Sequence, residues 1–373
     1  MSNSEIYPRT ETYYEKLGRL AKLTQFEKDE NGVLSLTKRD PKVPEGQEDP
    51  VLKTFQKEYK APADFHAPKS PVMEKGARPA RNETEKKLFA WRDRMNGIGQ
   101  NIMPLVQTKE IKLLDGLSFT EYIPQLTDLN QPLPAVIYYH GGGFIGGSVY
   151  LTQNFSYLLA QRAHARVFAL DFRYAPEYSY ENTTKETYDA LKYLHDHAAE
   201  LGVDPARITI YGESTGANIA AATIYLDRDT HFAKQQILCY PLVTIDDKQL
   251  AELVPQGAGS GAVGASGDFT TLIKTIGTAY THGQIDKRNE LVSPINYSEK
   301  TMKQLPRTII MTDEFDPLHN QGYQFAKKLT EGGVDVHYMY YPGMTHAFLN
   351  NVGLYAQAED FANEVTAWML GQN

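Results

Sequence analysis

The chain has 373 residues, a net charge of −8 and a hydrophobic content of 41%. This composition is typical of a globular protein with a sizeable core, and it excludes collagen-like and fully disordered classes. The acidic balance argues against nucleic acid and anionic membranes as partners, because both require a basic face on the protein.

Nothing in the sequence indicates a membrane span. The N-terminus lacks a basic region followed by an apolar run, and the apolar stretches are far shorter than the roughly 20 residues that cross a bilayer. We therefore expect a cytoplasmic protein. The single cysteine, Cys239, excludes an intrachain disulfide, and the sequence leaves a homo-oligomer open.

Residues 1–105 are rich in Lys, Glu, Pro and Asp and differ from the rest of the chain. Apolar spacing predicts one helix around residues 13–20 and another around residues 88–98, with Asn82 and Glu85 as an N-cap pair. Residues 38–79 predict an extended connector, because they hold many prolines and charges. Large aromatic side chains are costly to leave in water, so a cap over a site is favoured here over a solvated tail. These aromatic residues are Phe26, Phe55, Phe65, Phe89 and Trp91.

From residue 106 onward, predicted strands alternate with predicted helices. The strands are a hairpin of 106–114 and 118–123 around Asp115 and Gly116, followed by 133–139, 166–170, 208–211, 237–242, 308–312 and 334–341. The helices are 152–162, 185–197, 217–226, 323–330 and 353–370. This order predicts an α/β domain over residues 106–373, with a mostly parallel central sheet and helices on both faces.

Residues 246–290 interrupt the alternation, and we expect an irregular insertion that contributes to the cap. Within its small-residue run, Gly259, Gly261 and Gly264 match a dinucleotide-binding fingerprint in form. The match follows no clear strand and lies in glycine-rich sequence, so we interpret it as a loop and expect no cofactor.

A nucleophile signature lies between a predicted strand and a predicted helix. Gly212-Glu-Ser-Thr-Gly216 places Ser214 on a sharp turn whose strained backbone needs small neighbours. The following helix N-terminus favours negative charge that develops nearby. Ser214 is therefore the predicted nucleophile, and a purely structural turn is the alternative.

Three consecutive glycines follow the strand 133–139. Acyl transfer forms an oxyanion, which requires backbone N–H donors with no side chains in the way. We predict that the amides of Gly142, Gly143 and Thr215 form the oxyanion hole, with Gly141 supporting it. His140, which precedes the glycines, is expected to shape the loop.

A catalytic serine needs a base and an acid that orients the base. His346 is the best-placed base, because it follows the strand 334–341 on a loop. For the acid, Asp313, Glu314 and Asp316 all follow the strand 308–312. The order Ser214, Asp316, His346 is the order found in α/β-hydrolases, and all three loops lie at the carboxyl ends of parallel strands. His319 is a candidate for the wall of the site.

Taken together, these segments resemble the hormone-sensitive-lipase-like esterases of the α/β-hydrolase superfamily. The resemblance is carried by residues 140–144, 171–177, 204–205, 207–208, 212–216, 293–294, 316–318 and 346–348, and it spans about residues 106–373. It implies the α/β-hydrolase fold and selects Asp316 as the acid. It also implies a cap built partly from N-terminal helices. Asp171, Arg173 and Glu177 are interpreted as scaffold residues.

The resemblance implies a serine carboxylesterase that hydrolyses small, short-chain esters through an acyl-enzyme on Ser214. An amidase or peptidase using the same triad is one alternative. A receptor for small molecules with a dead site is another, although Ser214 and His346 are both present. No metal is expected, because the sequence has no His-x-x-x-His motif and no cysteine cluster.

Overall fold

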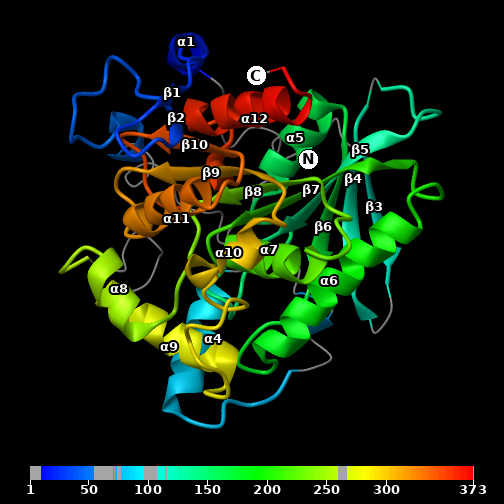
Figure 1. The fold of residues 1–373 in the computed structure, drawn as a ribbon, viewed down its shortest axis with the longest axis vertical. Helices are drawn as coiled ribbons and strands as arrows, with labels where there is room; N and C mark the ends of the chain where they lie inside the picture. The colour runs from blue at the N-terminus through cyan, green and yellow to red at the C-terminus, as the bar shows by residue number, and fades with distance from the viewer. Residues whose placement is uncertain are drawn as a thin grey trace, which may run out of the picture.

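The computed structural model describes residues 10–53, 70, 72–73, 77–95, 107–113, 116–125, 127–258 and 267–372. Its centre is a sheet of order β1-β2-β10-β9-β8-β7-β5-β6-β4-β3 (Figure 1). The strands are β1 (Glu27–Lys28), β2 (Leu34–Thr37), β3 (Gln107–Lys112), β4 (Ser118–Ile123), β5 (Leu133–Tyr139), β6 (Arg166–Asp171), β7 (Val203–Glu213), β8 (Gln235–Cys239), β9 (Arg307–Asp313) and β10 (Val336–Tyr341).

The helices connect and cover these strands. They are α1 (Glu11–Leu20), α4 (Glu83–Met95), α5 (Gln153–Ala163), α6 (Tyr180–Asp196), α7 (Thr215–Asp227), α8 (Asp247–Leu253), α9 (Phe269–Thr281), α10 (Glu299–Met302), α11 (His319–Glu331) and α12 (Ala356–Met369), with short 3-10 turns at Pro294–Asn296 and Phe348–Asn351.

The strands from β5 to β10 run parallel, which confirms the predicted sheet. The pairs β5–β6, β5–β7, β7–β8, β8–β9 and β9–β10 are all parallel. The predicted hairpin is present as the antiparallel pair β3–β4, which joins the sheet through β6. Asp115 of its turn lies outside the described residues, whereas Gly116 has the left-handed φ of 83° that such turns require.

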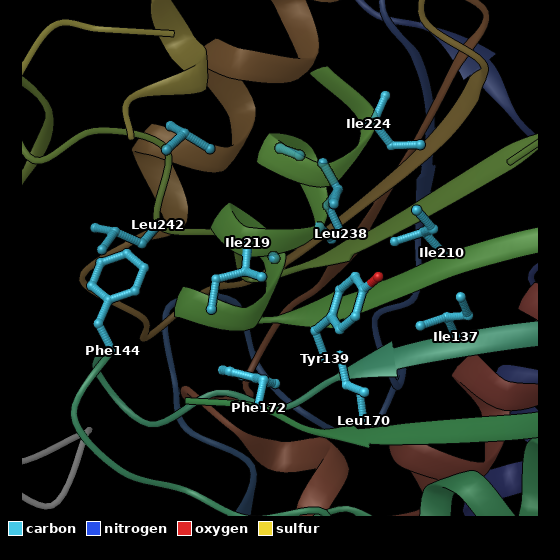
Figure 2. Packing of buried hydrophobic residues seen from close by; sticks show 14 of the residues in the cluster. Ile137, Tyr139, Phe144, Leu170, Phe172, Ile210, Ile219, Ile224, Leu238 and Leu242 are labelled. Carbon is cyan, nitrogen blue, oxygen red and sulfur yellow. The ribbon is translucent and has the colours of Figure 1, made fainter. Parts of the chain in front are cut away.

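Two hydrophobic layers hold the sheet, because successive strand residues point to opposite faces. On one face, residues such as Ile137, Tyr139 and Ile210 pack under α6, α7 and α11 (Figure 2). On the other face, their sequence neighbours Val136, Tyr138 and Tyr211 pack under α5 and α12. The predicted α/β fold class is therefore confirmed, with helices on both faces (Figure 1).

The N-terminal residues extend the sheet beyond what the sequence indicated. β2 adds to β10 in parallel register, with Leu34 opposite His337, and β1 pairs with β2. α1 packs on α12, where the Tyr13 hydroxyl donates to Glu359 at 2.7 Å. Residues 38–53 of the predicted connector lie against this side of the domain. Phe55 and Phe65 lie outside the described residues.

α4, α8 and α9 lie together at the end of the sheet where the parallel strands terminate (Figure 1). The expectation of an irregular segment at 246–290 is wrong for its described part, which contains α8 and α9. Each helix has an aspartate N-cap, Asp246 and Asp268, and α9 buries Phe269, Ile273, Ile276 and Tyr280 at helical spacing. Gly259, Gly261 and Gly264 lie outside the described residues.

Candidate active site

The turn that carries Ser214 is strained and closely packed. Ser214 has φ 55° and ψ −123° between β7 and α7, a conformation that non-glycine residues rarely adopt. A Cβ on Gly212 would lie 2.3 Å from the Gly216 carbonyl oxygen, and a Cβ on Gly216 would lie 2.2 Å from that of Tyr139. The glycines on both sides of Ser214 are thus required by backbone contacts.

Three predicted side chains meet at the carboxyl ends of the strands. The His346 Nε2 lies 3.0 Å from the Ser214 Oγ, and its Nδ1 lies 2.6 Å from the Asp316 Oδ2. The other oxygen of Asp316 accepts from the Leu318 amide at 2.8 Å. Asp316 and His346 are both buried. This geometry allows His346 to accept the Ser214 proton while Asp316 fixes the imidazole orientation.

The two other acid candidates occupy different environments. The Asp313 side chain is buried, and neither of its oxygens has a hydrogen-bond partner in the described part of the chain. Burial raises the pKa of this carboxyl well above its usual range. Glu314 accepts a hydrogen bond from the Gly343 amide at 2.8 Å, in the loop that leads to His346. The structure therefore brings Asp316, and neither of its two neighbours, to the His346 ring.

The glycine loop after β5 lies beside Ser214. A Cβ on Gly141 would lie 3.2 Å from the Ser214 Cβ. Gly142 has φ 127°, and a Cβ there would lie 2.1 Å from the Gly146 carbonyl oxygen. The Gly142 carbonyl accepts from the amides of Ile145 and Gly146, which closes the loop into a tight turn. Because these residues are glycines, the loop presents its backbone to Ser214 without side chains of its own.

The side chain of Thr215 fastens this loop to the nucleophile turn. Its Oγ1 accepts from the Phe144 amide at 3.2 Å. The sequence suggested only the Thr215 amide as a functional group, and the role of the hydroxyl was missed. A threonine directly after a nucleophile is the signal that indicates it.

His140 and His319 lie outside the hydrogen-bond chain of Ser214, His346 and Asp316. The His140 ring stacks on Phe172 at 4.4 Å, and burial lowers its pKa to about 4. It is therefore neutral at neutral pH and lies within the loop, as expected. The His319 Nδ1 lies 3.0 Å from the Thr312 Oγ1 at the start of α11, and its role in the wall of the site stays a prediction.

The three predicted scaffold residues hold neighbouring elements. Asp171 accepts from the Val72 amide at 3.5 Å, Arg173 pairs with Glu186 on α6, and Glu177 pairs with Arg92 on α4 at 2.6 Å. Burial raises the pKa of Asp171 to about 6.

Two helices pack over the glycine loop. A Cβ on Gly143 would lie 2.9 Å from the Trp91 Cη2 on α4 and 3.6 Å from the Ile276 Cδ1 on α9. The Phe144 ring stacks on Tyr280 of α9, with ring centroids 4.0 Å apart. The expected cap helix of the N-terminal region, α4, thus lies against the glycine loop, whose amides are the predicted oxyanion donors. Its N-cap is also confirmed, since the Glu85 amide donates to the Asn82 Oδ1 at 2.9 Å.

Arg92 anchors this arrangement, and sequence reasoning missed it. Its guanidinium donates to the Ile145 carbonyl, to the Ala175 carbonyl at 2.6 Å and to both oxygens of Glu177. Bidentate pairing to a buried carboxylate fixes orientation as well as position. α4 is thereby held to the glycine loop and to the segment after β6.

No group of three or more His, Cys, Asp or Glu side chains suited to a metal occurs in the described residues. The absence of a metal and of a cofactor stays a prediction. Within the same residues, no helix has the length and apolar character needed to cross a membrane.

Comparison with known proteins shows the family to which this chain belongs. A family model described as the alpha/beta hydrolase fold matches residues 136–350. The chain belongs to this family. The predicted resemblance to α/β-hydrolase esterases is thereby confirmed.

Several curated and solved relatives of this hydrolase are named as esterases or ester hydrolases. An arylesterase of Saccharolobus solfataricus is 31% identical over 58% of the chain and 68% of its own length. An ethyl acetate hydrolase of Pseudomonas putida is 27% identical over 64% of the chain and 73% of its own length. The structure of an esterase from Pyrobaculum calidifontis is 28% identical, covers 87% of the chain and 98% of its own, and has a TM-score of 0.65.

Proposed function

We propose that this hydrolase is a serine carboxylesterase that cleaves small carboxylic esters with short acyl chains. The observation that carries the proposal is the hydrogen-bond chain from Asp316 through His346 to Ser214, with distances of 2.6 and 3.0 Å. The relatives named as an arylesterase and an ethyl acetate hydrolase support the ester as substrate.

The first half of the reaction forms an acyl-enzyme. The His346 Nε2 removes the Ser214 proton while the Oγ attacks the ester carbonyl carbon. The resulting oxyanion accepts from the amides of Gly142, Gly143 and Thr215, and such donors typically contribute about 3 kcal/mol each. Collapse breaks the ester C–O bond, and the leaving oxygen takes the proton from His346 and departs as the alcohol.

The second half regenerates the enzyme. Water gives a proton to His346 and attacks the acyl carbon, and collapse returns this proton to Ser214 as the carboxylic acid leaves. Asp316 stabilises the imidazolium in both halves. In this proposal residues 106–373 form the catalytic domain, and α4 with α9 forms the cap over the oxyanion loop.

Hydrolysis of p-nitrophenyl esters from acetate to laurate, with Ser214→Ala in parallel, tests the proposal. We expect turnover that favours the shortest esters, and a loss of at least about 1,000-fold in kcat for Ser214→Ala. A folded wild-type chain that hydrolyses none of the esters, or a Ser214→Ala variant that retains turnover, contradicts it.

A further inference from the structure

The segment after β2 runs along the loop that carries His346. We call residues 38–49 the N-terminal strap. The Lys38 amide donates to the Tyr340 carbonyl at 2.8 Å, which continues the pairing of β2 with β10. Farther along, the Asp49 amide donates to the Gly343 carbonyl at 2.9 Å. The strap therefore reaches the His346 loop three residues before the histidine.

Contact between the strap and Gly343 is close on several sides. A Cβ on Gly343 would lie 3.2 Å from the Val43 Cγ1, 3.3 Å from the Asp49 nitrogen and 3.5 Å from the Gln47 carbonyl oxygen. Gly343 has φ 81°, so a side chain here is disfavoured by the backbone as well. Gly343 therefore packs directly against the strap.

The opposite side of the loop is held by the segment after β9. The Gly343 amide donates to the Glu314 carboxylate at 2.8 Å, and the Phe315 amide donates to the Met344 carbonyl at 2.9 Å. Both backbone polar groups of Gly343 are thus used, one by the segment that carries Asp316 and one by the strap.

The Asp49 carboxylate fixes the strap itself. It is fully buried and accepts from the Lys16 Nζ at 2.6 and 2.7 Å, from the Gln357 Nε2 at 2.7 Å and from the Val51 amide at 3.0 Å. Lys16 lies on α1 and Gln357 lies on α12. A buried carboxylate with this many donors is rigidly placed, because any displacement leaves charge and donors unpaired.

We propose that the N-terminal strap positions the catalytic histidine, with Asp49 as the positioning residue. The inference rests on the proposed function, since it assigns a purpose to the placement of His346. The strap contacts Gly343, whereas the hydrogen bonds of the Ser214 and Asp316 side chains are made with His346 and Leu318. Loosening it therefore misplaces the base in the reacting complex and leaves substrate binding intact.

Asp49→Ala and Asp49→Asn, assayed on p-nitrophenyl acetate at a temperature where both are folded, test the strap. We expect kcat to fall by about tenfold in Asp49→Ala, with KM within about twofold, because a displaced catalytic group costs rate and leaves binding unchanged. Asp49→Asn retains an acceptor for the Val51 amide, so it recovers most of the lost rate.

Glu121→Ala is the matched control. Glu121 is equally buried and pairs with Arg166 at 2.5 Å, but on β4 near the opposite edge of the sheet. We expect this variant to lose stability and to keep kcat per folded molecule. Where Asp49→Ala does not fold, the milder Lys16→Met replaces it, with an expected fall in kcat of about threefold at constant KM.

Different failures have different meanings. Wild-type kcat in a folded Asp49→Ala or Lys16→Met variant overturns the role of the strap. An equal fall in Glu121→Ala, or a change confined to KM, also overturns it. The proposed function is overturned if the wild-type chain hydrolyses none of the esters, or if its turnover persists in Ser214→Ala. The inference about the strap then falls with it.

Discussion

At the scale of single residues, Glu213 connects the nucleophile turn to its surroundings. Its carboxylate accepts from the hydroxyls of Tyr138 and Tyr240, both at 2.6 Å, and from the Gly141 amide. The residue directly before Ser214 thus holds the glycine loop after β5, one tyrosine on β5 and one tyrosine just after β8. Burial raises the pKa of this carboxyl, and the three donors oppose that shift.

Glu213→Ala is expected to lower the free energy of unfolding by about 3 kcal/mol, because it leaves two buried hydroxyls without an acceptor. Glu213→Gln keeps one acceptor oxygen and is expected to cost about 1 kcal/mol. Urea denaturation followed by circular dichroism measures both values. Glu252→Ala on the exposed face of α8 is the control and is expected to be neutral. An alanine variant at 213 as stable as the control contradicts the argument.

At the scale of elements, α4 determines how much space lies beside the glycine loop after β5. Arg92 holds this helix to the Ala175 carbonyl and to Glu177, and Trp91 then lies against Gly143. Because the anchor and the indole are neighbours on one helix, the position of the ring follows from the ion pair. In the proposed esterase, we expect a bulky ring at this place to favour short acyl chains.

Trp91→Ala is expected to shift the preference towards longer chains. Removing the indole opens space next to Gly143, so the ratio of kcat/KM for octanoate to that for acetate should rise by about tenfold, as added methylenes find apolar contacts. The p-nitrophenyl ester series measures this ratio. Leu88→Ala is the control. Leu88 is buried on the same helix, but its side chain faces the groove between α4 and α9. An unchanged ratio of octanoate to acetate in Trp91→Ala contradicts the argument that the indole limits the acyl chain.

The predicted triad could be placed from the sequence because local patterns determine where its members lie. Ser214, Asp316 and His346 each come after an apolar run that forms a parallel strand, and such strand ends share one edge of the sheet. The N-cap at Asn82 was predictable for the same reason, since its partner lies three residues away.

Contacts between distant segments could not be predicted from the sequence pattern. β2 alternates apolar and polar residues but has only four of them, too few to indicate a strand, and its partner β10 lies about 300 residues later. The pairing of Arg92 with Glu177 likewise joins two ordinary surface residue types across 85 positions. α9 was missed although Ile273, Ile276 and Tyr280 have helical spacing, because the glycine-rich run before it suggested a loop.

At the scale of the whole molecule, a buried lysine joins the N-terminal residues to the last helix. The Lys38 side chain is fully buried, and its Nζ lies 3.1 Å from Asp360 and 2.6 Å from Glu364, both on α12. It also donates to the carbonyls of Leu20, the last residue of α1, and Leu23, three residues later. Residues 10–53 are therefore part of the folded domain. Cytoplasmic localisation and a homo-oligomer stay predictions.

Two buried carboxyls make the stability of the whole fold depend on pH. Burial raises the pKa of Asp171 and of Asp360 from 3.8 to about 6. Because the folded chain binds these protons more tightly than the unfolded chain does, each carboxyl lowers the free energy of unfolding as pH rises from about 4 to about 6. This fall in the free energy of unfolding is complete above pH 6 and absent below pH 4.

Asp171→Asn removes one of these titrations while keeping an oxygen to accept from the Val72 amide. Relative to the wild type, its free energy of unfolding should rise by roughly 2 to 3 kcal/mol between pH 4 and pH 7. Asp204→Asn is a control whose change in unfolding free energy has the opposite sign. The Ala206 amide and Arg207 lower the pKa of Asp204. Its charge therefore stabilises the fold above the pKa of the unfolded chain, and the asparagine variant loses this stabilisation. Urea denaturation at each pH gives both curves. A difference between Asp171→Asn and the wild type that does not change with pH shows that this carboxyl does not titrate in that range.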